Sequence, residues 1–213
     1  MIITSDIHAE MGSVTIGSAD ETIIIAGDLS TYKAGNTNAL LEQYCNQYKN
    51  VIFVPGNHDY WGTSVEQYHK DLVVLPNLHT LQNSSVTIDG QRYVGTTLWY
   101  PWSVDCDLYW KLFNDYANIE DFRPHEFNSA AIEFLSSEVT SDDIVITHHL
   151  PSTLSTPEQY KTGPFNCFFV SDMSELILDR QPKIWIHGHT HIKCNYHLGE
   201  THVICNPVGY PWE

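Results

Sequence analysis

Basic residues are scarce in this sequence of 213 amino acids, in which 10 Lys and Arg stand against 26 Asp and Glu and leave a formal net charge of −16. Only three of the basic residues are arginines, Arg92, Arg123 and Arg180. Proteins that coat duplex nucleic acid neutralise its phosphates with Lys and Arg. The charge balance therefore argues against duplex DNA or RNA as a partner.

Long apolar runs and paired cysteines are also missing. No run approaches the roughly 20 apolar residues of a membrane-spanning helix, and the N-terminal residues lack the basic segment and apolar core of a secretion signal. The five cysteines are scattered, without a Cys-x-x-Cys pair, which is typical of reduced thiols. We therefore expect a cytoplasmic protein with no membrane partner.

Length and composition favour one folded domain. The chain is 42% hydrophobic and 17% charged, a balance typical of globular proteins. No internal repeat or linker-like run divides the sequence, so residues 1–213 are predicted to form a single domain. The sequence leaves the oligomeric state open. Its unusual feature is a set of 12 histidines, whose positions carry more information than their number.

Five short apolar runs each end in polar residues that can bind metals. They are rich in β-branched residues, which indicates strands covered on both faces in a layered α/β protein. Ligands bind such sheets beyond the carboxyl ends of the strands. The five segments are residues 1–8, 22–28, 51–59, 144–149 and 184–191.

The remaining pattern mixes helices with antiparallel strands. Apolar residues at helical spacing predict helices over residues 40–48 and 131–139, and a third helix after Ser171 as its cap. A hairpin is predicted around Asp89-Gly90, and residues 201–205 form a last strand. The mixture predicts an α/β (α+β) fold of two packed mixed sheets flanked by helices. A single doubly wound sheet is the alternative.

Seven polar side chains follow these apolar runs. Two carboxylates, one amide and four imidazoles suit divalent transition metals, although a single Asp is often a turn cap and a single His is often only hydrogen-bonded. The paired residues in Asp-x-His and His-x-His are expected on one side of extended segments, and the preceding glycines to allow sharp turns. The seven residues are Asp6, His8, Asp28, Asn57, His148, His189 and His191.

The ordered set of motifs resembles the calcineurin-like metallophosphoesterases. It consists of Asp-x-His at 6–8, Gly-Asp at 27–28, Gly-Asn-His-Asp at 56–59, His148 at a strand end, and Gly-His-x-His at 188–191. The resemblance implies a β-sandwich flanked by helices that holds two divalent ions. It also implies hydrolysis of small phosphomonoesters or phosphodiesters by a hydroxide that bridges the ions.

The resemblance further implies a function for each residue. Asp6, His8 and His191 would hold the first ion, and Asn57, His148 and His189 the second, with Asp28 bridging both. His58 would be the acid that protonates the leaving group, oriented by Asp59. His149 also lies at its strand end, so either neighbour could be the ligand; we assign His148, and His149 then contacts substrate or is structural.

The charge of such a centre suits a phosphate ester. Two divalent ions carry four positive charges, and two carboxylates and one hydroxide offset three, which leaves about +1. The donor set suits Mn, Fe, Zn or Ni and does not choose among them. Two other functions remain open: a metal-binding scaffold of the same fold with weak catalysis, and a nuclease that acts on short single strands.

An aromatic-rich insertion spans about residues 98–127. One interpretation is a wall on which a substrate ring stacks, and the other, which we favour, is a helical insertion that buries its aromatic rings in the core. The aromatic residues are Trp99, Tyr100, Trp102, Tyr109, Trp110, Phe113, Tyr116 and Phe122.

Overall fold

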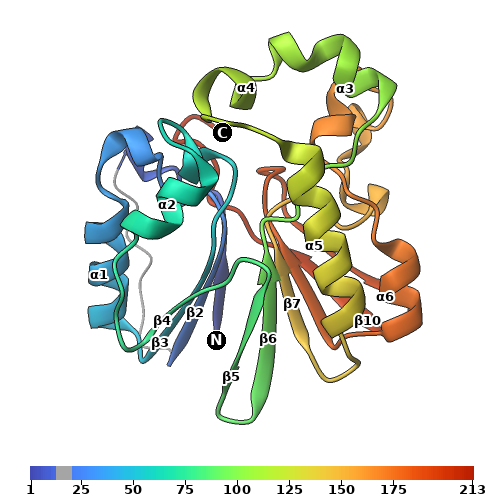
Figure 1. Ribbon diagram of the computed structural model, residues 1–213. Coiled ribbons are helices and arrows are strands. Elements are labelled where there is room, and N and C mark those ends of the chain that lie inside the picture. The colour runs from blue at the N-terminus through green and yellow to red at the C-terminus, as the bar shows by residue number, and fades with distance from the viewer. Residues whose placement is uncertain (13–20) are drawn as a thin grey trace.

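The computed structural model describes residues 1–12 and 21–213 (Figure 1). Its strands are β1 (Ile2–Thr4), β2 (Thr22–Ala26), β3 (Asn50–Val54), β4 (Leu78–Thr80), β5 (Ser84–Ile88), β6 (Gln91–Thr96), β7 (Ile144–Thr147), β8 (Ile184–His187), β9 (Cys194–Leu198) and β10 (Thr201–Cys205). Its α-helices are α1 (Thr37–Gln47), α2 (Val65–Asp71), α3 (Val104–Tyr109), α4 (Asp115–Asn118), α5 (Pro124–Glu138) and α6 (Ser174–Arg180).

The strands form two sheets. The first has the order β1-β2-β3-β4 and contains only parallel pairs. The second has the order β5-β6-β7-β8-β10-β9 and is mixed, because the hairpins β5–β6 and β9–β10 are antiparallel. The predicted hairpin around Asp89-Gly90 and the predicted last strand are therefore confirmed. The prediction of two packed sheets is also confirmed, and the alternative of a single doubly wound sheet is wrong.

The two sheets pack face to face, and helices cover both outer faces. Figure 1 shows α1 and α2 on one side and α5 and α6 on the other. Strand β2 illustrates how the sequence produces these layers. Its Ile23 and Ile25 belong to the cluster that includes α1, whereas Ile24 and Ala26 join residues of the second sheet. Alternate side chains of a strand point to opposite faces, so an unbroken apolar run fits a strand buried on both.

The third predicted helix begins later than expected. Helix α6 starts at Ser174, and the carboxylate of Asp172 accepts a hydrogen bond from the Ser174 backbone amide at 3.0 Å. Ser171 does not cap this helix, since its hydroxyl accepts a hydrogen bond from the Asn128 side chain at 2.8 Å. The local apolar pattern located the helix, but Asp172 satisfies its N-terminus.

The aromatic residues of the segment 98–127 divide into buried and exposed ones. Trp99 and Tyr100 are fully buried in the core cluster of the first sheet, as expected for structural aromatics. Trp102 and Trp110 are exposed. Helices α3 and α4 lie above the ends of the strands in Figure 1, so the insertion also covers the edge where the metal-competent residues gather.

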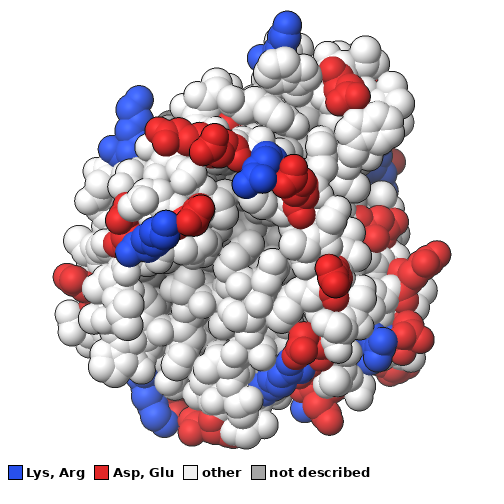
Figure 2. Space-filling model, viewed as in Figure 1, with Lys and Arg blue, Asp and Glu red and all other residues white. Residues whose placement is uncertain are grey.

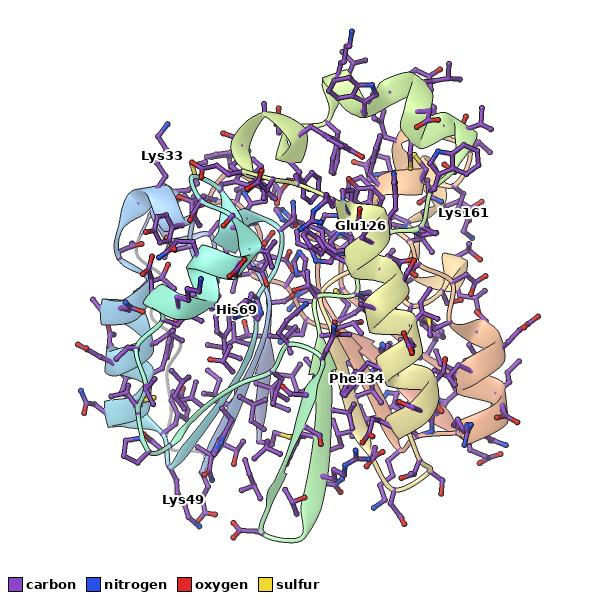
Figure 3. All side chains as sticks on the ribbon, in the orientation of Figure 1. Lys33, Lys49, His69, Glu126, Phe134 and Lys161 are labelled. Atoms are coloured by element: carbon purple, nitrogen blue, oxygen red, sulfur yellow. The ribbon has the colours of Figure 1, made fainter. Side chains whose placement is uncertain are left out.

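Charged side chains are scattered over the surface. On the face in Figure 2, blue basic side chains occur singly among red acidic ones. Figure 3 shows Lys33, Lys49 and Lys161 extending outward at separate places on the periphery. In the described part of the chain, no helix is both long and apolar enough to cross a membrane.

Candidate metal centre and active site

The carboxyl ends of five parallel strands bring the predicted metal ligands together. Asp6 follows β1, Asp28 follows β2, Asn57 follows β3, His148 follows β7 and His189 follows β8. All five side chains are buried, Asp6 and His148 completely. The two sheets deliver these residues to one edge of the sandwich, where open α/β sheets bind ligands.

Asp6, His8 and His191 form the first cluster, in which one candidate ligand atom of each residue lies within 4.8 Å of the others. The Nε2 atoms of His8 and His191 are 2.9 Å apart. Glu10 lies 3.1 Å from His8 Nδ1, and Glu213 lies 2.7 Å from His191 Nδ1. A carboxylate that accepts a hydrogen bond from Nδ1–H fixes the tautomer and leaves Nε2 free for a metal.

Asp28, His148 and His189 form the second cluster, and Asn57 joins it through His148. The Nε2 atom of His148 lies 3.0 Å from Asn57 Oδ1 and 3.4 Å from Asp28 Oδ2. His148 Nδ1 lies 2.9 Å from the Ala26 carbonyl oxygen, which can accept only from a protonated nitrogen. Nε2 is then the nitrogen that faces the other candidate ligands, and it would give up its proton to bind a metal.

Asp28 lies between the two clusters. Its Oδ2 atom is 3.6 Å from His8 Nε2 and 3.4 Å from His148 Nε2. One carboxylate thus faces ligand nitrogens of both clusters, the position that a bridging ligand would take. The donor set, made of carboxylate oxygens, imidazole nitrogens and an amide oxygen, fits divalent transition metals.

The electrostatics of the site favour positive charge. Burial lowers the pKa of His148, but Asp28 and Asp6 outweigh it and raise that pKa to about 9. Burial raises the pKa of Asp28, yet His148, His58 and His8 hold it well below its usual value. These groups favour protons at the place where a cation would bind. A bound metal ion would displace those protons.

The ligand segments are not extended, in contrast to the expectation from the Asp-x-His and His-x-His spacing. Five of the candidate ligands have positive φ angles: Asp6 51°, His8 46°, Asp28 55°, His189 75° and His191 51°. Left-handed backbone is uncommon for residues other than glycine and is concentrated at functional sites. Turns at these five positions, rather than the period of a strand, direct the side chains inward.

The glycines before the candidate ligands are required mainly because a Cβ atom there would clash with neighbouring side chains of the site. A Cβ atom on Gly56 would lie 2.2 Å from Asp28 Oδ1, and one on Gly27 would lie 2.0 Å from His148 Nδ1. Gly27 also has a φ of 90°, as expected for a sharp turn, but at the Gly56 position the main constraint is the adjoining carboxylate. Any larger residue would displace ligand side chains.

His58 borders the cavity beside the clusters. Its ring stacks on Trp61 with centroids 3.7 Å apart, and its Nδ1 lies 3.8 Å from Glu10 Oε1. Burial raises the pKa of Glu10, but the imidazoles of His58 and His8 outweigh it and lower that pKa to about 2. Glu10 is therefore an ionised carboxylate behind both imidazoles.

The carboxylate of Asp59 binds backbone amides, whereas the resemblance implied that it orients the His58 ring. Its carboxylate accepts hydrogen bonds from the backbone amides of Asp28 at 2.8 Å, Ser30 at 3.2 Å and Gly56 at 2.7 Å. Asp59 therefore ties the loop after β2 to the loop after β3. The carboxylate beside the His58 ring is that of Glu10, which lies 3.8 Å from His58 Nδ1.

His149 is buried behind the site. Its Nδ1 lies 3.1 Å from the Thr97 carbonyl oxygen, and its ring packs 4.4 Å from that of His189. Burial and the neighbouring His148 lower the pKa of His149 to about 3. The ring is fully buried and does not border the cavity, so its position fits a structural function and not a contact with substrate.

Sequence reasoning missed a further carboxylate at the site. Asp115 of α4 accepts hydrogen bonds from Asn57 Nδ2 at 2.9 Å and from Trp61 Nε1 at 2.7 Å. The bond to Nδ2 turns Asn57 Oδ1 toward His148. No motif marks Asp115, because it lies in the insertion and meets Asn57 only in the folded chain; Glu10 offered a weak signal, as the third member of an Asp6-x-His8-x-Glu10 alternation.

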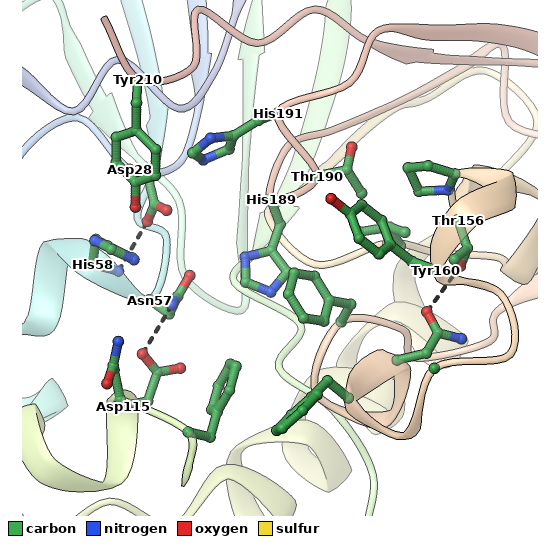
Figure 4. A pocket seen from close by; sticks show the side chains of 18 of the residues that line it. Asp28, Asn57, His58, Asp115, Thr156, Tyr160, His189, Thr190, His191 and Tyr210 are labelled. Carbon is green, nitrogen blue, oxygen red and sulfur yellow. Dashed lines mark hydrogen bonds between the residues drawn. The ribbon is translucent and has the colours of Figure 1, made fainter. Parts of the chain in front are cut away.

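A cavity of about 500 Å³ opens beside the clusters. Figure 4 shows Asp28 and His58 on one side of it and Tyr160 on the other, with His189 between them. The side away from the ligands is largely apolar and comes from the insertion and from the segment after β7. The cavity lining is Asp28, Asn57, His58, Trp61, Leu112, Phe113, Asn114, Asp115, Leu150, Thr156, Pro157, Tyr160, Gly163, Phe165, Asn166, Phe169, His189, Thr190, His191, Tyr210 and Glu213.

Comparison with known proteins agrees with this architecture. Residues 2–193 match the family of calcineurin-like phosphoesterases. The chain therefore belongs to the calcineurin-like phosphoesterase family and is a metal-dependent hydrolase of phosphoric esters. The resemblance seen in the motifs is thereby confirmed.

Individual relatives are distant in sequence. An uncharacterised protein of Acanthamoeba polyphaga mimivirus is 22% identical over 223 residues, which cover 90% of this chain and 79% of the viral protein. The crystal structure of phosphopantetheinyl hydrolase from Mycobacterium tuberculosis is 16% identical with a TM-score of 0.78, covering 99% of this chain and 89% of that one. A protein of Thermus thermophilus, TT1561, is 14% identical with a TM-score of 0.59, covering 96% and 87%. These similarities establish the shared fold.

Proposed function

We propose that the chain binds two divalent ions and hydrolyses small phosphomonoesters or phosphodiesters. Asp6, His8 and His191 would hold one ion, and Asn57, His148 and His189 the other, in line with two of the three groups of candidate ligand atoms among the described residues. The third group, His8, Glu10 and His58, shares His8 with the first. The observation that carries the proposal is the position of Asp28 Oδ2, within 3.6 Å of a ligand nitrogen in each cluster.

The bound ions would supply an activated water molecule and neutralise charge on the phosphoryl oxygens. Mn, Fe, Zn and Ni all suit the donor set. The chain's own residues provide the remaining chemistry. His58 borders the cavity and would give a proton to the departing alkoxide oxygen, and the Glu10 carboxylate lies 3.8 Å from its Nδ1.

The charge of the protein supports small substrates. Around the cavity, no Lys or Arg appears among the described lining residues. A long polyanion needs many basic contacts, so neither duplex nucleic acid nor an extended strand suits this surface. The five cysteines are free thiols in the described structure, which supports a reducing compartment such as the cytoplasm.

Metal titration of the chelator-treated protein tests the dinuclear centre. We expect two equivalents of Mn²⁺ by calorimetry, with hydrolysis of bis-p-nitrophenyl phosphate appearing as the ions bind. Asp28→Asn should bind fewer than two ions and lose the activity, because the bridging position loses its charge. Asp172→Asn, which alters an exposed carboxylate that accepts a hydrogen bond from the first amide of α6, is the matched control and should behave as wild type. Saturation at one ion, or two ions with full activity in Asp28→Asn, would overturn the proposal.

A further inference from the structure

The cavity has two chemically different halves. One half contains the metal-competent side chains, and the other is an apolar wall made of Leu112, Phe113, Tyr160, Phe165 and Phe169. Leu112 and Phe113 come from the insertion, and the other three come from the segment between β7 and α6. Two segments that are far apart in the sequence thus form one wall.

The wall begins at the metal centre and runs outward to solvent. Phe169 packs on the imidazole of His189, with ring centroids 4.4 Å apart, and Phe113 stacks on Phe168 at 4.3 Å with an angle of 9° between the planes. Farther out, Leu112 is 68% exposed and Phe165 is 40% exposed. Apolar side chains left open beside a polar site are typical of ligand pockets.

Basic side chains are absent from the described lining of this half of the cavity. Among its described lining residues there is no Lys or Arg, and the carboxylates of Asp115 and Glu213 already have protein partners in Asn57 and His191. Lys161 lies in the same segment as Tyr160, but its amine pairs with Glu158 at 2.6 Å instead of bordering the cavity. A second anionic group on the substrate would find no partner here.

We propose that the apolar wall is a subsite for an uncharged ester group, so that the preferred substrate is a phosphodiester with a single negative charge. This inference rests on the proposed dinuclear function, because two ions with two carboxylates and one hydroxide leave about one positive charge. One such charge matches a diester monoanion better than a monoester dianion. In the reaction, water adds to phosphorus, the P–O bond to one alcohol breaks, that alcohol leaves with a proton, and a phosphomonoester remains.

Two variants of the exposed part of the wall test the subsite. Leu112→Ala and Phe165→Ala remove apolar surface from side chains that are already exposed, so the fold should persist. The matched control is Leu108→Ala, which removes a 67% exposed leucine from the same insertion but outside the cavity lining. Bound Mn²⁺ is measured in every variant to show that the metal centre is intact.

Binding is measured by calorimetry on the Mn²⁺-loaded protein with three ligands: diphenyl phosphate, diethyl phosphate and phenyl phosphate. We expect diphenyl phosphate to bind about tenfold more tightly than the other two, since a buried ring contributes roughly this factor. Leu112→Ala and Phe165→Ala should each reduce that preference about threefold or more, and Leu108→Ala should leave it unchanged. The ratio of kcat/KM for bis-p-nitrophenyl phosphate to that for ethyl p-nitrophenyl phosphate should fall in parallel.

The outcomes separate this inference from the proposed function. If two ions bind and esters are hydrolysed, but the preference for diphenyl phosphate is absent or unaffected by both wall variants, the subsite is refuted and the dinuclear function stands. Tighter binding of the dianion phenyl phosphate, or faster hydrolysis of p-nitrophenyl phosphorylcholine than of bis-p-nitrophenyl phosphate, would also refute it. Failure to bind two ions would overturn both.

Discussion

The side-chain amide of Asn57 donates a hydrogen bond to Asp115 at 2.9 Å, and this contact joins the insertion to the metal centre. Asp115 is fully buried, and burial raises its pKa although Asn57 and Trp61 oppose the shift. An amide can present either its oxygen or its nitrogen to a neighbour. By accepting from Nδ2, Asp115 leaves Oδ1 to face His148, the orientation that a metal ligand needs.

Asp115→Ala should therefore weaken binding of the second ion. Without the acceptor, Asn57 can rotate and direct Nδ2 toward the site; loss of such an outer contact costs about tenfold to hundredfold in metal affinity. Calorimetric titration with Mn²⁺ measures the effect as one weakened site beside one normal site. Asp115→Asn keeps an acceptor oxygen and should restore most of the affinity. Equal weakening of both sites, or no weakening in Asp115→Ala, would exclude this positioning function.

His58→Ala should separate metal binding from proton transfer. The imidazole is expected to protonate the leaving alkoxide and is not among the proposed ligands, so both ions should remain bound. Hydrolysis of esters with poor leaving groups should fall by about 10² to 10⁴, the usual contribution of a general acid. Activated p-nitrophenyl esters, whose leaving group needs little protonation, should slow far less. Equal slowing across a series of leaving groups would remove His58 from this function.

Glu10→Gln should change how stability depends on pH. Because the folded protein lowers the pKa of Glu10 from 4.5 to about 2, the ionised carboxylate stabilises the fold above the unfolded value and loses that contribution as the pH falls toward the folded one. In the chelator-treated protein, Glu10→Gln should thus be less stable than wild type near about pH 6, and the difference should shrink to roughly half near about pH 3. Urea denaturation at both pH values measures this. Glu126→Gln, on an exposed face, serves as the control, and a gap that does not narrow at low pH would contradict the assignment.

Gly56→Ala should disrupt the centre through lack of space. The new methyl would lie 2.2 Å from Asp28 Oδ1, so the bridging carboxylate or the loop must move. We expect a loss of roughly 1–3 kcal/mol in the free energy of unfolding, as for other overpacked sites, together with weaker metal binding. Gly163→Ala is the control, because its methyl meets only the Tyr160 carbonyl at 3.3 Å and its φ of −75° suits any residue. A Gly56→Ala protein as stable as Gly163→Ala would show that the loop adapts without cost.

The sequence predicted the fold and most of the candidate site for a clear physical reason. Buried strands such as β2 require unbroken apolar runs, and ligands bind beyond the carboxyl ends of parallel strands. Asp28 after β2 of the first sheet and His148 after β7 of the second could therefore both be expected at the site. The function of Asp115 could not be predicted in this way. Its partner Asn57 lies 58 positions away, and only the packing of the insertion brings the two together.

The backbone conformation at the site could not be predicted from the sequence either. The spacing of Asp6 and His8 suggested an extended strand, yet both residues are left-handed, because hydrogen bonds from their amides to the Gly27 and Asp28 carbonyl oxygens hold the loop in a turn. Similarly, the Gly-Asn-His-Asp motif drew attention to Asp59 as a partner of His58. The side chain instead satisfies three backbone amides of the adjoining loops. Neither outcome depends on residue type alone.

The left-handed conformation of five candidate ligands also affects how this site should be mutated. At Asp28 or His191, both of positive φ, an alanine removes the donor and at the same time places a residue with poor tolerance for that backbone, so two effects become mixed in one variant. Asparagine accepts this backbone readily. Substitutions to asparagine therefore keep the backbone and change only the charge or type of the donor, and a family of natural sequences that lost the metals would be expected to carry Asn or Gly at these places before any branched residue.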